Sequence, residues 1–227
     1  GIYSTNELHY LFYESCSTFN FETKRVCQGL ANLFSEEVYF ILTHTNLSSD
    51  EVCGIVVGAK CLDNPRQAYG NWTVNLPKRN IQANAFNSDT SHQVKNSLRI
   101  LHLADVHIDP WYLPGGYSDC GEPLCCRATS VKGKTEKTAG FWGDYYSCDT
   151  PENTITQLFT FINQTLTQQY DILIWTGDVS AHDVWNNTKS SVINGTRLLS
   201  SLIKHNLANY KLVLPAIGNH EGFPVNQ

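Results

Sequence analysis

The chain has 227 residues, of which 41% are hydrophobic and 16% are charged, and its formal net charge is −5 at pH 7. This composition is typical of a globular protein, and the length allows one large domain or two ordinary ones. The slightly acidic charge disfavours binding to nucleic acid, and no apolar run approaches the roughly 20 residues that a transmembrane helix needs.

The cysteines and the glycosylation motifs point to the secretory pathway. The chain has eight cysteines but no Cys-x-x-Cys spacing, so a disulfide framework fits better than a metal cage. Five Asn-x-Ser/Thr motifs are candidate glycosylation sites, at Asn46, Asn71, Asn163, Asn186 and Asn194. Together these features predict a secreted or lysosomal protein. Because the chain contains no methionine, we also expect it to be a processed form or a fragment.

Residues 1–61 are predicted to form helices. Apolar residues recur at steps of three and four in the segment 27–42, which is the pattern of a helix with one apolar stripe. The segment 8–16 has the same spacing. Ser48 and Glu51 form a capping-box pattern, so a third helix is predicted to start there. The sequence therefore predicts a small helical module at the N-terminus.

A change of pattern divides the rest of the chain. Residues 62–97 hold no apolar period and are predicted to be a linker. Three short apolar runs then read as buried strands, at residues 98–104, 171–176 and 210–217. Amphipathic helices are predicted between them, at residues 151–166 and 186–205. The alternation of strands and helices predicts an α/β region with parallel strands.

Residues that can bind metal follow all three predicted strands. They are Asp105 and His107 after the first strand, Asp178 after the second, and Asn219 and His220 after the third. Because the carboxyl ends of parallel strands meet at one edge of a sheet, we expect these side chains to lie close together. Mixed oxygen and imidazole donors suit Zn, Mn or Fe, and a carboxylate can bridge two ions. The sequence therefore predicts a metal site at this edge.

The order D-x-H, G-D and G-N-H-E resembles the signature of the calcineurin-like metallophosphoesterases. The segments 105–109, 119–127, 175–185 and 218–226 further resemble the acid sphingomyelinase family, and the N-terminal helices resemble its saposin domain. The resemblance implies an α+β protein, in which a helical saposin-like module precedes the first half of an αββα metallophosphoesterase sandwich. The expected domains are a saposin-like domain incomplete at its N-terminus, a linker, and a catalytic domain incomplete at its C-terminus, at residues 1–61, 62–97 and 98–227.

The resemblance also implies a site with two zinc ions. Asp105 and His107 would hold one ion, Asp178 would bridge both, and Asn219 would bind the second. In the family, three further histidines complete the site, and they come from the second half of the catalytic domain. The remaining ligands are therefore expected beyond Gln227, and we expect this chain alone to be inactive.

Two histidines are expected to act on the substrate. His182 and His220 match family histidines beside the scissile phosphate, which are assigned to transition-state stabilisation and leaving-group protonation. Glu221 is expected to orient His220 or to cap a turn rather than to bind metal. Six aromatic residues have two open interpretations, lining the substrate edge or ordinary packing, namely Trp111, Tyr112, Phe141, Trp142, Tyr145 and Tyr146.

The disulfide pairing comes from the resemblance, because spacing alone cannot select one of the many possible connectivities. It implies the pairs Cys16–Cys27, Cys120–Cys125 and Cys126–Cys148. Cys53 and Cys61 match saposin cysteines whose partners would lie before Gly1.

The implied function is hydrolysis of a phosphodiester in the complete protein. The expected reaction is the cleavage of sphingomyelin to ceramide and phosphocholine, with the saposin-like module presenting the sphingolipid at a membrane surface. One alternative is a phosphodiesterase of the acid-sphingomyelinase-like group that cleaves nucleotides or other diesters. Another is a non-catalytic, saposin-type lipid-binding protein with a decayed catalytic half. Completeness of the natural chain, in particular a downstream His-x-His, would discriminate the enzyme from the binding protein.

Overall fold

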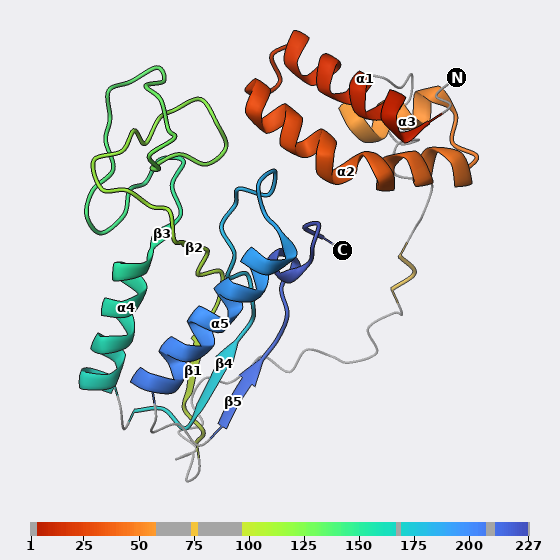
Figure 1. Cartoon of the computed structure of the whole chain (residues 1–227). Coiled ribbons are helices and arrows are strands. Elements are labelled where there is room, and N and C mark those ends of the chain that lie inside the picture. The colour runs from red at the N-terminus through yellow and green to blue at the C-terminus, as the bar shows by residue number, and fades with distance from the viewer. Residues whose placement is uncertain (1–3, 58–73, 77–96, 167–168, 208–211, 227) are drawn as a thin grey trace. The chain divides into compact units, whose positions relative to one another are not determined.

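The structure of the chain is a computed structural model that describes residues 4–57, 74–76, 97–166, 169–207 and 212–226 (Figure 1). The chain forms two compact units, Gly1–Glu36 with Leu98–Gln227, and Glu37–Ser97. No helix in the described part is both long and apolar enough to cross a membrane. The domain boundaries expected from the sequence stay a prediction.

The first two helices are joined by a disulfide. Helix α1 (Thr5–Thr18) begins after Ser4, whose side chain accepts a hydrogen bond from a backbone N–H group of the first turn. Helix α2 (Lys24–His44) follows a short turn. Cys16 at the end of α1 is bonded to Cys27 at the start of α2, and this is the pair that the resemblance implies. The bond ties the two amphipathic helices together where the turn joins them.

The third helix begins where the sequence predicts it. Helix α3 (Ser49–Val57) follows Ser48, which forms a capping box with Glu51. The backbone N–H of Ser48 donates to the Glu51 carboxylate at 2.8 Å, and the backbone N–H of Glu51 donates to the Ser48 hydroxyl at 3.3 Å. The side chain of Cys53 and the whole of Cys61 lie outside the described residues, and so does the pairing expected for them.

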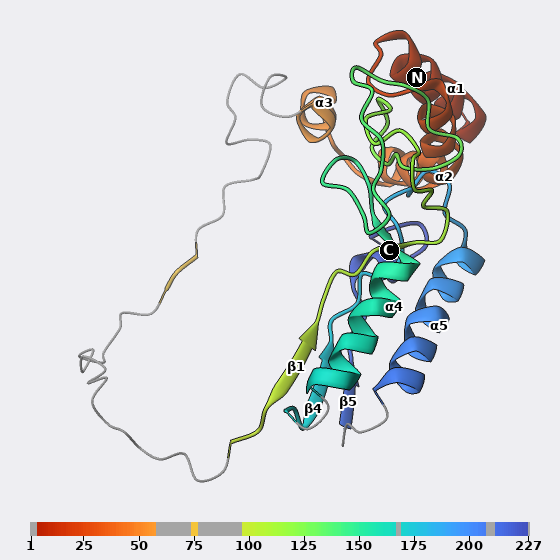
Figure 2. The ribbon, with the colours of Figure 1, turned by 90° about the vertical axis from the view of Figure 1, so that its left-hand side faces the viewer.

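A parallel sheet with two helices forms the second half of the fold. Strands β1 (Ile100–Leu103), β4 (Ile172–Trp175) and β5 (Leu212–Pro215) lie in the order β1-β4-β5, and both pairings are parallel. Helix α4 (Glu152–Phe161) precedes β4, and helix α5 (Lys189–Asn206) precedes β5. Figure 2 shows both helices on the same side of the sheet. The mixed α/β fold predicted from the sequence is therefore confirmed.

The element boundaries differ from the predicted ones at two helices. The predicted helix 186–205 begins at Lys189 instead, because Thr188 caps it. The Thr188 hydroxyl accepts a hydrogen bond from the backbone N–H of Ser191 at 3.0 Å. The other predicted helix ends as an α-helix at Phe161, and a turn of π-helix continues it over Ile162–Leu166.

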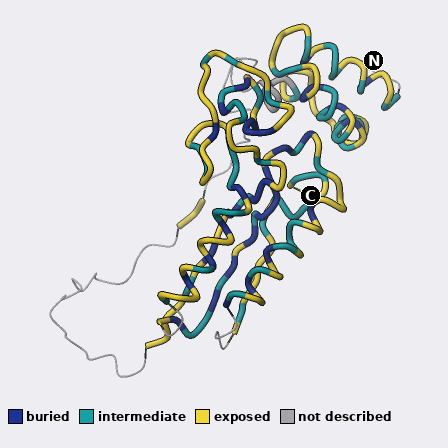
Figure 3. Tube along the Cα trace, turned by 60° about the vertical axis from the view of Figure 1, so that its left-hand side comes forward, coloured by how far each residue is buried: buried dark blue, intermediate teal, exposed yellow. Residues whose placement is uncertain are grey.

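The main apolar core lies between the sheet and these helices. Phe159 of α4, Leu173 of β4 and Leu199 of α5 are fully buried in it. Figure 3 shows the buried positions recurring along the helices and strands on the sides that face each other. Burial of side chains of this size contributes about 1.5–3 kcal/mol each, so this cluster holds the strand ends in fixed positions.

The opposite face of the sheet carries exposed apolar side chains. Ile100, Leu212 and Leu214 are 55%, 47% and 45% exposed. Parallel sheets are normally covered on both faces, and exposed apolar patches mark surfaces that bind another layer or partner. We therefore expect a further layer on this face, as the resemblance to an αββα sandwich implies.

A long disulfide-bonded loop joins two short strands that the sequence analysis did not predict. Strands β2 (Ile108–Asp109) and β3 (Thr150–Pro151) pair in parallel and have two residues each. Such short strands carry no readable periodicity. The loop between them contains the bonded pairs Cys120–Cys125 and Cys126–Cys148, which are those that the resemblance implies.

Arg127 of this loop forms a buried ion triad with two carboxylates. It donates to Asp109 through Nε and Nη2, at 2.8 and 2.9 Å, and to Asp183 through Nη1 at 2.5 Å. The three side chains are 8%, 0% and 5% exposed. Burial alone would lower the pKa of Arg127, but the hydrogen bonds to the two carboxylates outweigh it and raise that pKa. The triad links β2, the disulfide loop and the segment after β4.

Replacement of Arg127 by Met is expected to destabilise the protein strongly. The change would leave Asp109 and Asp183 buried without a counter-ion, which typically costs about 3–5 kcal/mol. The free energy of unfolding in urea measures the effect. Arg25→Met is the control, because the Arg25 side chain is 44% exposed, so its ion pair is worth at most about 1 kcal/mol. Equal stabilities for the two variants would contradict the importance of the triad.

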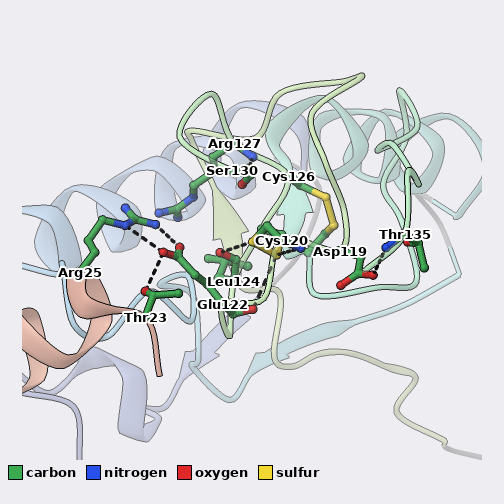
Figure 4. The surroundings of a disulfide bond; sticks show 12 residues. Thr23, Arg25, Asp119, Cys120, Glu122, Leu124, Cys126, Arg127, Ser130 and Thr135 are labelled. Carbon is green, nitrogen blue, oxygen red and sulfur yellow. Dashed lines mark hydrogen bonds and ion pairs between the residues drawn. A yellow bond between two sulfur atoms is a disulfide. The ribbon is translucent and has the colours of Figure 1, made fainter. Parts of the chain in front are cut away.

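Helix α2 packs against the disulfide loop (Figure 4). Glu122 of the loop accepts hydrogen bonds from the Thr23 hydroxyl at 2.9 Å and from Nε of Arg25 at 3.2 Å. An apolar cluster buried at the same place is formed by Val26, Leu124, Ala181 and Trp185. The start of α2 is thereby fixed against residues 181–185, which follow β4.

Candidate metal centre

The ends of the three parallel strands bring the predicted ligands together. Asp105 and His107 follow β1, Asp178 follows β4, and Asn219 begins the 3-10 helix η4 (Asn219–Glu221) after β5. Two backbone hydrogen bonds join the first two loops. The N–H of Asp105 donates to the carbonyl oxygen of Gly177 at 3.3 Å, and the N–H of His107 donates to the carbonyl oxygen of Asp178 at 3.1 Å. The parallel strands and these contacts together place residues that are distant in sequence at one edge.

Three of these residues have an unusual backbone conformation. The φ angles of Asp105, His107 and Asp178 are 52°, 34° and 56°. Positive φ is uncommon for residues other than glycine and costs about 1–3 kcal/mol at each position. Such strain persists where the surrounding structure imposes it, and it concentrates at functional sites. The presence of three such residues at this edge favours a functional site there.

Two glycines allow the loops after β4 and β5 to approach closely. A Cβ atom on Gly177 would overlap the backbone N of Gly218, and a Cβ atom on Gly218 would overlap the Asp178 carboxylate. Glu221 then ties the two loops together. Its carboxylate accepts from the backbone N–H groups of Asp178, Gly218 and Val179, each at 2.8 Å. Glu221 therefore positions the backbone around Asp178.

One ion could be held by three side chains. The candidate ligand atoms of Asp105, His107 and Asp178 all lie within 4.8 Å of one another. Nδ1 of His107 is 2.8 Å from the carbonyl oxygen of Ser180, which can only accept, so Nδ1 carries the proton. Nε2 of His107 therefore keeps a lone pair for a metal, and a hydrogen bond of this kind is the usual way to orient a histidine ligand.

Asn219 extends the site towards a second ion. One terminal atom of its amide lies 3.2 and 3.0 Å from the two carboxylate oxygens of Asp178, while its Nδ2 lies 2.9 Å from Oδ1 of Asn226. When Nδ2 donates to Asn226, the Asn219 oxygen faces the Asp178 carboxylate. The reversed amide satisfies the hydrogen bonds within the protein, because its NH2 group then donates to the Asp178 carboxylate. In the first orientation the Asn219 oxygen and the Asp178 carboxylate offer neighbouring acceptors, which is the donor chemistry that a metal ion requires.

His182 and His220 lie next to His107. The ring centroid of His107 is 3.9 Å from that of His182 and 4.7 Å from that of His220, and the last two are 4.8 Å apart. The candidate ligand atoms of the three histidines also lie within 4.8 Å of one another. Among the described residues there are thus two overlapping candidate metal groups, and they share His107. All six predicted site residues belong to this edge of the sheet.

Asp149 holds His182 and was missed by the sequence analysis. One carboxylate oxygen accepts from Nδ1 of His182 and the other from the backbone N–H of His182, both at 2.7 Å. The hydrogen bond to Asp149 raises the pKa of His182, although partial burial opposes it. Asp149 lies between Cys148 and β3, so only the folded disulfide loop brings it to the site. No signal in the sequence indicates this pairing.

His220 has the opposite electrostatic environment. Burial lowers its pKa, and the nearby His107 and His182 lower it further. Its Nδ1 atom is buried and has no hydrogen-bond partner in the described structure. Two neighbouring histidines whose pKa values are shifted in opposite directions are typical of sites that use one protonated and one neutral imidazole.

A site of this kind can support phosphoryl chemistry. The chain belongs to the calcineurin-like phosphoesterase family, because the model of that family matches residues 98–226. It is similar to sphingomyelin phosphodiesterase B of Dictyostelium discoideum, with 39% identity over 216 residues and 93% of the chain. It is also similar to the human sphingomyelin phosphodiesterase, with 32% identity over 212 residues and again 93% of the chain. These matches confirm the resemblance to the acid sphingomyelinases.

The extent of the matches is also informative. The chain covers 32% and 33% of those two relatives, so it spans about a third of their length. A human cyclic GMP-AMP phosphodiesterase is 33% identical over 127 residues, which are 56% of the chain and 26% of that protein. Similarity to the sphingomyelin phosphodiesterases thus extends over much more of this chain than similarity to the cyclic dinucleotide enzyme.

Proposed function

We propose that the full-length natural protein hydrolyses sphingomyelin to ceramide and phosphocholine at a site with two zinc ions. The convergence of Asp105, His107, Asp178 and Asn219 at three strand ends is the observation that carries the proposal. Sphingomyelin is preferred as the substrate because the similarity to sphingomyelin phosphodiesterases extends over 93% of the chain.

Each proposed ligand has a defined task. Asp105 and His107 would hold one ion, Asn219 would hold the other, and Asp178 would bridge them. When bound, two such ions polarise phosphoryl oxygens and lower the pKa of water for attack on phosphorus. Glu221 keeps Asp178 in position through the backbone, since its carboxylate holds the N–H groups on both sides of the bridging residue.

The two histidines would act on the phosphoryl group and the leaving group. His182 is held by Asp149 through Nδ1, so its Nε2 is the atom that can donate a proton or a hydrogen bond to the substrate. His220 lies beside both His107 and His182. A departing alkoxide would need a proton from His182 or His220. The raised pKa of His182 favours the protonated form there.

The N-terminal helices support a role at a lipid surface. We propose that they form the saposin-like module that presents sphingolipid. Val26 of α2 packs with Ala181 and Trp185, which lie on either side of His182 in the sequence. The helical module would therefore also stabilise the loop that carries His182.

Disulfide bonds and exposed glycosylation motifs support the secretory pathway. Three disulfides are present in the described part of the chain. Four of the candidate glycosylation sites are exposed, at Asn46, Asn163, Asn186 and Asn194, while Asn71 lies outside the described residues. We propose that the protein is secreted or lysosomal.

Substrate choice tests the proposal. The full-length natural protein would be assayed with sphingomyelin in vesicles, with a cyclic dinucleotide, and with a generic aryl phosphodiester. We expect zinc-dependent hydrolysis of sphingomyelin with release of phosphocholine, and little hydrolysis of the cyclic dinucleotide. Preference for the cyclic dinucleotide would overturn the assigned substrate. Binding to lipid vesicles without hydrolysis of any of the three would favour a lipid-binding protein.

A further inference from the structure

A hollow in the described structure is lined in part by Asp149, which also holds His182 of the candidate metal centre. It has a volume of about 430 Å³, and its described lining includes Trp142, Asp144, Tyr145 and Asp149. Asp149 is the residue whose carboxylate holds His182, so the hollow and the candidate metal centre share this residue. The proposed reaction does not use the other three residues.

The wall of this hollow is held by the start of α4. The hydroxyl of Thr154 donates to the carbonyl oxygen of Trp142 at 2.7 Å, and Nδ2 of Asn153 donates to the carbonyl oxygen of Phe141 at 2.9 Å. Asp144 accepts from the backbone N–H of Tyr146 at 2.9 Å, which fixes the following turn. The aromatic segment is therefore anchored at several points.

The rings in this segment are open to a ligand. Trp142 is 57% exposed and Tyr145 is fully exposed, so neither ring is covered by the rest of the fold. Phe141 packs edge-on against Trp142, with centroids 4.8 Å apart. The charged residues in the described lining are both carboxylates, Asp144 and Asp149. The Asp149 carboxylate is already paired with His182, so Asp144 supplies the unpaired negative charge here. Aromatic faces next to this carboxylate attract a cation and disfavour an anion.

We propose that this hollow, named here the aromatic subsite, binds the quaternary ammonium of a choline headgroup. A quaternary ammonium has no N–H to donate, and it is recognised by aromatic faces through cation–π attraction, assisted by nearby carboxylates. Because Asp149 both lines the subsite and holds His182, the headgroup of a phosphodiester bound at the metal centre would lie near the subsite. The inference rests on the proposed function for the identity of the phosphodiester, but the chemistry of the subsite selects the headgroup independently.

A pair of substrates that differ by one atom tests the proposal in the full-length natural protein. They are a phosphocholine diester and its 3,3-dimethylbutyl analogue, in which carbon replaces the charged nitrogen. We expect the parent protein to favour the choline ester in kcat/KM by about 10-fold, which is the range of a partly desolvated cation–π contact. Trp142→Ala should bring this ratio close to one. Phe161→Ala, which removes an aromatic side chain that is 51% exposed and lies at the far end of α4, should leave it unchanged.

A binding measurement separates failure of this proposal from failure of the proposed function. Tetramethylammonium would be titrated into the protein while the indole N–H signals are followed by NMR, with Trp142→Ala to assign the signal. A saturable shift of the Trp142 signal supports the subsite even if no ester is hydrolysed. No shift, or hydrolysis of sphingomyelin with equal kcat/KM for the two esters, would overturn the aromatic subsite and leave the proposed function standing.

Discussion

Asp178→Asn in the full-length natural protein is expected to reduce sphingomyelin hydrolysis by more than about 100-fold. Loss of a residue that only supports a metal ligand costs up to about 100-fold in activity, and loss of the ligand itself should cost more. Asp178 is the residue that we propose to bridge both ions. Its carboxylate lies against the Asn219 amide and accepts from the backbone N–H of His220 at 2.9 Å. Loss of its charge would weaken both metal positions at once.

The same substitution should leave the fold intact. Asn has nearly the volume of Asp, and the hydrogen bond from the Asp178 backbone to Glu221 does not involve the altered side chain. Thermal unfolding and bound zinc would be measured with the activity. Asp50→Asn, on the exposed start of α3, is the matched control. Near-parent turnover with two bound zinc ions in the Asp178 variant would refute the bridging role.

His182→Ala is expected to keep both metal ions and to lose about 10²–10⁴-fold in turnover, the range for removing a general acid or base. Its Nδ1 is already hydrogen-bonded to Asp149, and its ring packs against that of His107, which is the proposed ligand. Asp149→Asn should also reduce turnover, but by a smaller factor. An amide has one acceptor oxygen and no charge, so it cannot accept from both N–H groups of His182 and also stabilise the protonated ring. Turnover and bound zinc measured on the same samples check both variants.

The competing assignment makes His182 a ligand. The ligand atoms of His107, His182 and His220 are close enough to hold one ion, so the geometry by itself permits this group. In that case the zinc content of His182→Ala would fall together with its turnover. Such a result would show that His182 binds the metal and does not act on the substrate.

The helices and the three longer strands of this fold could be predicted from local patterns, whereas the two-residue strands β2 and β3 could not. Apolar runs such as Leu173 with its neighbours are buried in the core, and the Ser48 capping box begins a helix as expected. The gathering of the proposed ligands at one edge could also be predicted, because parallel strands bring their carboxyl ends together. The helix predicted over 186–205 begins later, at Lys189, because Thr188 caps it.

The supporting residues could not be predicted in the same way. Asp149 reaches His182 from 33 positions earlier in the chain, and Arg127 reaches Asp183 from 56 positions away. Both contacts depend on the course of the loop between β2 and β3, which has almost no regular structure. Pairing between distant polar residues is set by tertiary packing and leaves no periodic signal in one sequence.

The metal content of the full-length natural protein tests the central claim most directly. Zinc per chain would be measured by elemental analysis before and after dialysis against a chelator, and sphingomyelin hydrolysis would be followed on the same samples. We predict two zinc ions per chain, loss of hydrolysis when they are removed, and recovery when zinc is restored. Undiminished hydrolysis by protein from which all metal has been removed would contradict a metal centre at the ends of β1, β4 and β5.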